Sequence, residues 1–377
     1  MKKILIVFVM FLGLLLVACT ETKPKVLPDM NDNDRMELTL AQKIDFLSNL
    51  EAPDLSSNAL MLNLFSKMNV DFAVSTEQNL TLDIRSNVDQ QAKFNADLDV
   101  ELYGKLGDSA SSSIVYANLK RAFLSVEQKA STKFMEDDIS SHTNITVDFS
   151  NSFFLIHQTH AYYQLNGLYD YNLEQNGEVL LDEKDSFDNL QEKVSTPIFT
   201  ESDYQELIEQ LSFFELPDTN DLDLNEFFEA FETISKHIEI YKTNDTYTIR
   251  ILADASIIRD GIDEMKKVLI EFYDGFESNI DQEILTLFDK IKDSIKSFDL
   301  DFRVEVVNHK ITRILFGISG HFQFEKDNTY PLTLNVNIER LGFILDLNPT
   351  APNMPSTNDL ANFKVVEYPS FIPNTLR

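Results

Sequence analysis

Few residues in this chain have the types and spacing that could support metal binding. His157 and His160 form an H-x-x-H pair, a spacing that occurs in metal sites. On a single strand, however, side chains three positions apart point to opposite faces, so the two imidazoles could not share one ion. No third ligand lies nearby in the sequence. The pair is therefore interpreted as two ordinary strand histidines.

An acidic segment at 221–232 has the spacing of a calcium-binding loop. Its oxygen-bearing side chains are Asp221, Asp223, Asn225, Glu229 and Glu232. Such a loop requires Gly at its sixth position for a sharp turn, and this chain has Glu226 there. An apolar stripe that includes Phe228 also continues through the segment. The alternative is the acidic start of a helix, in which Asp223 and Glu226 cap free amides.

No constellation typical of catalysis stands out. Gly317-Ile318-Ser319-Gly320 places a serine between glycines, but inside a strand pattern instead of at a strand-to-helix turn. A glycine-rich phosphate loop is absent, and the whole chain has only ten Gly. The sequence therefore predicts a non-enzyme without cofactor or metal. An extracellular hydrolase that uses a carboxylate pair is the least favoured alternative.

The overall charge excludes one large class of partner. The 377 residues include 62 acidic and 32 basic ones, which gives a formal net charge of −30. Nucleic-acid binding requires basic patches against phosphate, so no nucleic-acid partner is expected. The apolar fraction of 43% is typical of a globular protein. The single Cys excludes an intrachain disulfide and a zinc site built from cysteines.

The N-terminus has the pattern of an export signal. Lys2 and Lys3 precede an apolar run over 4–18 that ends in Leu16-Val17-Ala18-Cys19. A run of about 15 residues is shorter than the ~20 that a membrane-spanning helix needs. It fits the apolar region of a secretory signal peptide.

The Leu-Val-Ala-Cys tetrad resembles the lipobox of bacterial lipoproteins. The resemblance implies a lipoprotein signal peptide over 1–18, cleavage before Cys19 and a lipid anchor on that thiol. It places the mature protein at the extracytoplasmic face of the cell membrane. The alternatives are an ordinary signal peptide with a chance Cys and a short uncleaved anchor.

Hydrophobic periodicity predicts the order of the elements that follow. Residues 19–35 are polar and read as a tether, and 36–50 fit a short helix with Thr39 as its N-cap. From about 69 to 181 apolar and polar residues alternate, which is typical of strands. The pairs Asn166-Gly167 and Asn176-Gly177 predict hairpin turns.

The second half returns to a helical period and then to strands. Helices are expected over 199–297, interrupted by a strand pair at 238–243 and 246–252 that turns near Asn244-Asp245. One of these helices covers about 257–273. Three strands follow up to about 338, the first two joined at Asn308-His309-Lys310. We expect a single α+β domain over 36–347 and a proline-containing tail over 348–377.

This order is similar to the LolA/LppX-type lipoprotein fold, most clearly over 238–324. The resemblance implies an α+β fold in which a long, curved antiparallel sheet, an incomplete barrel, is covered by helices. It also implies an apolar cavity that carries a lipid or another hydrophobic ligand.

Two functions follow from these patterns. The first is a membrane-anchored, non-catalytic lipoprotein that binds a lipid or hydrophobic small molecule beneath the sheet. The expected ligand-binding residues are Phe302, Val304, Phe316, Ile318, Phe322, Leu334, Val336, Phe227 and Phe231. The second is a structural or surface-interaction lipoprotein whose core is fully packed and holds no ligand. Its protein partner is not specified by the sequence.

Overall fold

The computed structural model describes Leu27 and residues 36–51, 59–81, 84–134, 137–212, 238–274, 282–326 and 331–370. Cys19, Phe227, Phe231 and the acidic segment at 221–232 lie outside these residues.

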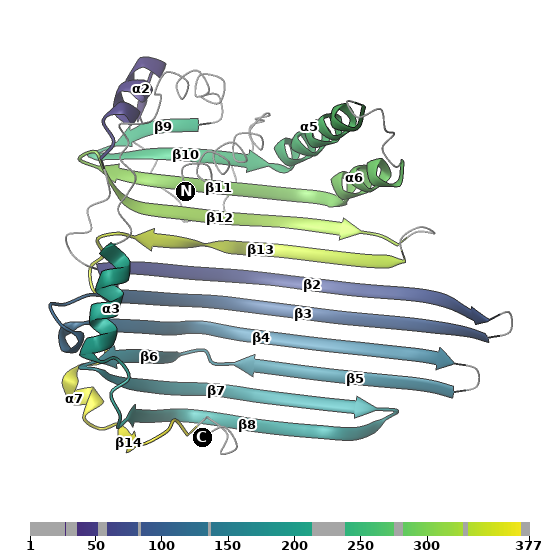
Figure 1. The fold of residues 1–377 in the computed structure, drawn as a ribbon, viewed down its shortest axis with the longest axis horizontal. Coiled ribbons are helices and arrows are strands. Elements are labelled where there is room, and N and C mark those ends of the chain that lie inside the picture. The colour runs from purple at the N-terminus through teal and green to yellow at the C-terminus, as the bar shows by residue number, and fades with distance from the viewer. Residues whose placement is uncertain are drawn as a thin grey trace.

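Most of the described chain forms one open, 14-stranded sheet (Figure 1). The strands of its N-terminal half are β1 (Met36–Glu37), β2 (Ala59–Thr81), β3 (Ile84–Lys105), β4 (Ile114–Phe134), β5 (Asp137–Asp148), β6 (Ser152–His157), β7 (His160–Gln175) and β8 (Glu178–Val194). Those of its C-terminal half are β9 (Ile238–Thr243), β10 (Thr246–Asp254), β11 (Ile295–Val307), β12 (Lys310–Phe324), β13 (Leu332–Asp346) and β14 (Lys364–Val366).

The sheet consists of two antiparallel meanders joined side by side. One runs from β9 to β13, and the other from β2 to β8, with β5 and β6 continuing one another beside β4 and β7. The long-range pairing of β13 with β2 joins the two meanders and aligns Met61 with Asp346 and Val74 with Leu332. The short strands β1 and β14 pair with the outer strands β9 and β8. β14 is parallel to β8, whereas the other pairs are antiparallel.

Alternation of side chains gives this sheet two chemically different faces. Val70 of β2 lies opposite Phe94 of β3 and Val336 of β13, so apolar residues meet across neighbouring strands. Bulges keep these residues on one side where the sequence changes phase. Between Ile338 and Arg340, for example, the register shifts and Leu341 still faces the same side as Ile338. We call this side the apolar face and the opposite side the polar face.

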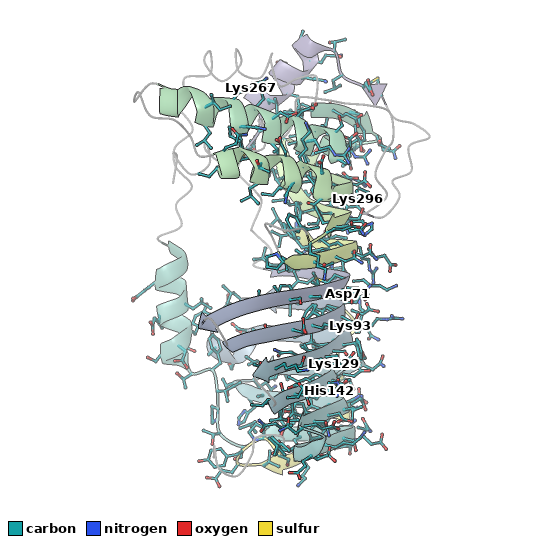
Figure 2. All side chains as sticks on the ribbon, turned by 90° about the vertical axis from the view of Figure 1, so that its right-hand side faces the viewer. Asp71, Lys93, Lys129, His142, Lys267 and Lys296 are labelled. Atoms are coloured by element: carbon teal, nitrogen blue, oxygen red, sulfur yellow. The ribbon has the colours of Figure 1, made fainter. Side chains whose placement is uncertain are left out.

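The longer helices lie on one side of the sheet, the apolar face (Figures 1 and 2). They are α2 (Leu40–Ser48), α3 (Glu201–Ser212), α5 (Ala255–Asp274) and α6 (Gln282–Ser294). A 3₁₀ turn, η2 (Ala110–Ser112), and a short helix, α7 (Thr357–Leu360), complete the described elements. The predicted N-cap of α2 is confirmed, because the Thr39 hydroxyl accepts a hydrogen bond from the Gln42 amide.

The predicted fold class is wrong. The structure is mostly β, with one large open sheet in place of an α+β incomplete barrel covered by helices. The strands are far longer than the apolar repeats suggested, since β2 alone has 23 residues. The described helices reach only parts of the apolar face, and no other described element forms a second layer over the remainder. The expected tail from 348 holds α7 and β14.

Of the two predicted Asn-Gly turns, one is confirmed and the other is wrong, and their contacts explain the difference. Asn176-Gly177 closes the β7–β8 hairpin with both residues at positive φ, as predicted. Asn166-Gly167 instead lies inside β7, at a register shift against β8. There the Asn166 amide donates to the Ser152 hydroxyl at 2.9 Å, and a Cβ on Gly167 would meet the Asp148 carbonyl oxygen at 2.0 Å. The glycine therefore permits close strand approach and does not form a turn.

Candidate functional site

The apolar face brings together the predicted ligand-binding residues that the structure describes. Phe302 of β11 lies opposite Phe316 of β12, and Phe322 of β12 opposite Val336 of β13. Val304, Ile318 and Leu334 occupy the same face of these three strands. All seven side chains are partly buried.

Some of these residues pack into a core. Ile257 of α5 is buried against Ala253 and Leu300, and Phe302, Phe316 and Ile318 pack on this cluster. Phe46 of α2 covers Val304 and stacks on Tyr247, with ring centroids 4.6 Å apart. The helices α2 and α5 therefore use this end of the apolar face for folding.

Several apolar side chains on β2 to β6 remain accessible on this face. Leu60 and Leu64 of β2 are 44% and 38% exposed, and Leu98 of β3 is 37% exposed. Val115 of β4 and Phe154 of β6 extend this exposed area toward β7. The sequence prediction missed these residues, although β2 and β3 carry the same alternation as the strands it selected. We call these five residues the open apolar patch.

The patch leads into an apolar pocket of about 590 Å³ at the β6–β8 end of the sheet. Strands provide one wall through Leu119, Ala161, Leu165 and Val194, and the segment after β14 provides the other. We call residues 360–370, which run from α7 through β14 to Ser370, the strap. Small-molecule sites commonly have volumes of roughly 300–1,000 Å³ and mostly apolar walls. The pocket falls within this description.

A buried carboxylate holds the strap beside the pocket. Glu192 of β8 is fully buried and accepts hydrogen bonds from the hydroxyls of Tyr163 and Ser370. The Ser370 amide also donates to it at 2.9 Å, and the Lys364 ammonium lies 3.7 Å away. Burial opposes ionisation, but these hydrogen bonds and the Lys364 charge outweigh it and lower the pKa of Glu192. The carboxylate is therefore a charged anchor.

The polar face is organised by charge. Asp71, Lys93 and Glu127 lie in one cross-strand row over β2, β3 and β4, and Lys129 and His142 lie in a neighbouring row (Figure 2). The hydrogen bond and charge of Lys129, 2.6 Å away, lower the pKa of Glu127. Opposite charges on adjacent strands stabilise a solvated face.

One ion cluster on the polar face is buried. Asp301 of β11 is fully buried and receives two hydrogen bonds each from Arg250 and Arg303, at 2.6 and 3.0 Å. Burial raises the pKa of Asp301, but the two guanidinium groups outweigh it and lower the pKa overall. Each guanidinium group bonds both carboxylate oxygens of Asp301, and such bidentate pairs hold neighbouring strands together.

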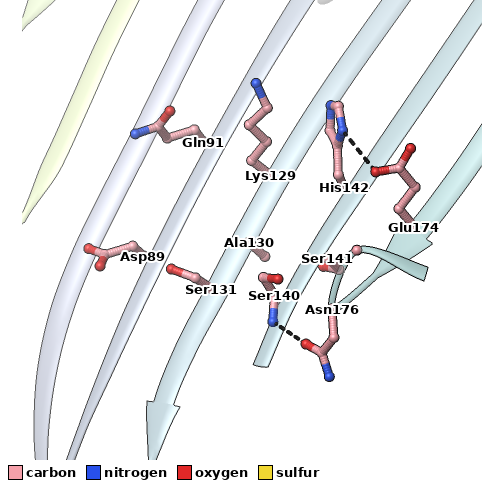
Figure 3. Close-up of a pocket in the computed structure, with 11 residues that line it drawn as sticks. Asp89, Gln91, Lys129, Ala130, Ser131, Ser140, Ser141, His142, Glu174 and Asn176 are labelled. Atoms are coloured by element: carbon pink, nitrogen blue, oxygen red, sulfur yellow. Dashed lines mark hydrogen bonds and ion pairs between the residues drawn. The ribbon is translucent and has the colours of Figure 1, made fainter. Parts of the chain in front are cut away.

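A polar hollow of about 430 Å³ lies on the same face near the β4–β5 and β7–β8 turns (Figure 3). His142 lies 4.0 Å from the Glu174 carboxylate, and the Ser140 amide donates to Asn176 at 2.8 Å. Most of its lining residues are polar, and Lys129 and Asp89 among them bond to Glu127 and Ser75 outside the hollow. Among the described residues, no group of three or more His, Cys, Asp or Glu is placed to hold a metal ion.

The histidine pair is arranged differently from the prediction. His157 ends β6 and His160 begins β7, and the two are directly opposite in a hairpin, so they share one face. Gln158 and Thr159 form the turn with positive φ. A hairpin, which sequence spacing alone did not reveal, replaces the single strand. The His160 ring instead lies 2.9 Å from the Gln158 carbonyl oxygen.

Comparisons with known proteins give no relative from which a function could be taken. No family model matches the chain, and no curated protein matches it. Among solved structures, the chain is similar to the translocator domain of the autotransporter NalP from Neisseria meningitidis, at 6% identity over 81% of this chain and 93% of that one. The TM-score is 0.13, too low to inform either fold or function. In the part of the chain that the structure describes, no helix has the length and apolar character needed to span a bilayer.

Proposed function

We propose that the protein is an extracytoplasmic lipoprotein, anchored through lipidated Cys19, that binds a lipid or other hydrophobic ligand on the apolar face without catalysing a reaction. The supporting observation is the open apolar patch, which is continuous with the apolar pocket. Exposed leucines on neighbouring strands form a contiguous surface that a water-soluble face would not retain without a use. The ligand lies against an accessible sheet in this proposal, and not in a cavity enclosed by helices.

The anchor and the ligand require separate tests. For the anchor, the full chain is expressed in a bacterial host fed an alkyne-labelled fatty acid, and label on the protein is measured after purification. We expect label on the wild-type chain and none on Cys19→Ser. Label retained by Cys19→Ser would contradict the anchor.

For the ligand, the full chain is purified in a mild detergent, and lipid extracted from it is identified by mass spectrometry. We expect co-purified acyl lipid in near-stoichiometric amount, reduced in the double variant Leu64→Ser/Leu98→Ser. Equal traces of lipid in both proteins would favour the second hypothesis, a surface-interaction lipoprotein that holds no ligand.

A further inference from the structure

The strap wraps around the outer edge of the sheet. On the polar face, Leu360 and Phe363 pack in a buried cluster with Tyr103 and Tyr116. The chain then runs parallel to β8 as β14, with Val366 aligned with Val194. It ends on the apolar face, where Ser370 binds Glu192 as described above. One short segment therefore contacts residues of both faces and pairs with the edge of β8, and Figure 1 shows α7 and β14 at that edge of the sheet.

The pocket wall formed by the strap is accessible and mostly apolar. Tyr368 is 50% exposed, and Phe154 and Ile198, which line the same pocket, are also exposed. The Tyr163 hydroxyl, which could have made the interior polar, is bonded to Glu192 instead. Such walls suit an alkyl chain, because the transfer of its methylene groups from water to an apolar surface is favourable.

The charge at the pocket selects against one kind of head group. Glu367 lines the pocket and is exposed, and no Lys, Arg or His is among the lining residues that the structure describes. The whole chain carries a formal charge of −30. A carboxylate or phosphate head at the mouth would be repelled, whereas an uncharged head would not.

We propose that this pocket binds the tail of a single-chain amphiphile with an uncharged head. In this proposal the strap forms the wall beside which the tail enters. This deepens the proposed function and rests on it. It names the strap pocket as the position of the tail and the head-group class as uncharged.

Because the chain has no Trp, a single introduced Trp can report where the tail of the amphiphile binds. Three full-length variants each carry one Trp: Tyr368→Trp in the strap, Leu64→Trp in the open apolar patch and Val268→Trp on α5. The probe is monolaurin, kept below its aggregation concentration. We expect the emission of Tyr368→Trp to shift to shorter wavelength with saturation, and that of Val268→Trp to stay constant.

The other outcomes separate the two proposals. A shift at Leu64→Trp without one at Tyr368→Trp would overturn the pocket and leave the proposed function standing. The absence of a shift at both positions would overturn both.

The head-group preference is tested with dodecanoate, which has the same tail as monolaurin. At low ionic strength we expect Tyr368→Trp to bind dodecanoate at least about fivefold more weakly, because charges at the mouth are then least screened. Adding Glu367→Gln should narrow the difference, and added salt should do the same. Equal affinities for the two probes at low ionic strength would overturn the preference for an uncharged head.

Discussion

At the scale of single residues, two carboxylates are buried among the side chains that the structure describes in this sheet, one on each face. Asp301 is bonded to two arginines on the polar face, and Glu192 is bonded to Tyr163 and Ser370 on the apolar face. A buried charge is tolerated only when its hydrogen bonds and counter-charges compensate for lost hydration. Each carboxylate thus makes the surrounding structure dependent on its ionisation.

Asp301→Asn should strongly destabilise the fold. The substitution leaves two buried guanidinium groups without a counter-charge, and removal of one partner of a buried pair costs about 3–5 kcal/mol. Urea denaturation of the full chain measures the change. Asp170→Asn is the matched control, because the Asp170–Lys184 pair is exposed and its loss should leave the midpoint nearly unchanged. Equal midpoints for the two variants would contradict a structural role for Asp301.

Attachment of the strap should weaken in acid. The pKa of Glu192 is lowered in the folded protein, so its stabilising effect is fully present above the unfolded value of about 4.3. That effect is lost as the pH falls through the lower folded value. Hydrogen exchange of the 364–370 amides, compared between neutral pH and pH values below ~4, should show greater loss of protection there than in central β3. Glu192→Gln should show the weakened attachment already at neutral pH, and unchanged protection in that variant would contradict the anchor.

At the scale of elements, close approach of neighbouring strands places strict limits on particular glycines. Gly342 of β13 lies opposite Gly317 of β12, and a Cβ on Gly342 would meet the Phe316 carbonyl oxygen at 2.0 Å. The atom in the way is backbone, so the strand itself would have to move. Gly104, at the end of β3, has no such neighbour within 4 Å.

Gly342→Ala and Gly104→Ala should therefore change the free energy of unfolding in opposite directions. Overpacking at Gly342 should destabilise the protein by about 1–3 kcal/mol. At Gly104 the added methyl restricts the unfolded chain, and a stabilisation of about 0.4–1 kcal/mol is expected. Denaturant midpoints of the two variants test this. A neutral Gly342→Ala would mean that β12 and β13 lie further apart than described.

Strands and turns were predicted well where the signal lies in residues close together in the sequence. Period-two alternation identified most strands, and Asn244, Asn176 and Asn308 marked real turns through their positive φ. The failures came from contacts distant in sequence. Asn166-Gly167 has hairpin chemistry, yet Ser152 holds Asn166 in a bulge. Alternation also says nothing of which strands pair, so the join of β13 with β2 and the single open sheet were not foreseen.

At the scale of the whole molecule, the described sheet presents an apolar face and a polar face. Apolar side chains on a packed sheet are hidden by a second layer. Here the described helices lie over parts of the apolar face, and the sequence pattern that placed seven described candidates on this face did not indicate which of them stay accessible.

Leu64→Ser/Leu98→Ser should lower ligand binding at a moderate cost in stability. The two side chains are 38% and 37% exposed, so each still buries part of its surface, and we expect a loss of about 1–2 kcal/mol per leucine, less than a fully buried leucine would cost. Uptake of a fluorescent acyl probe and the denaturant midpoint are measured together. Val268→Ser, which removes an exposed apolar side chain from α5, is the control and should keep full uptake. A large drop in midpoint for the double variant would show that the patch is part of the core.

The join between β13 and β2 also bears on how the chain is made. β2 is available early in synthesis, but its partner strand begins at Leu332, so one edge of the β2–β8 meander waits for nearly the whole chain. An unpaired strand edge of 23 residues is a template for wrong pairing. Closing so distant a contact is slow, because the loop entropy is lost before the pairing is gained. The two meanders should therefore fold independently, and their late docking should limit the folding rate. Until they dock, the unpaired edge of β2 must be protected from wrong pairing.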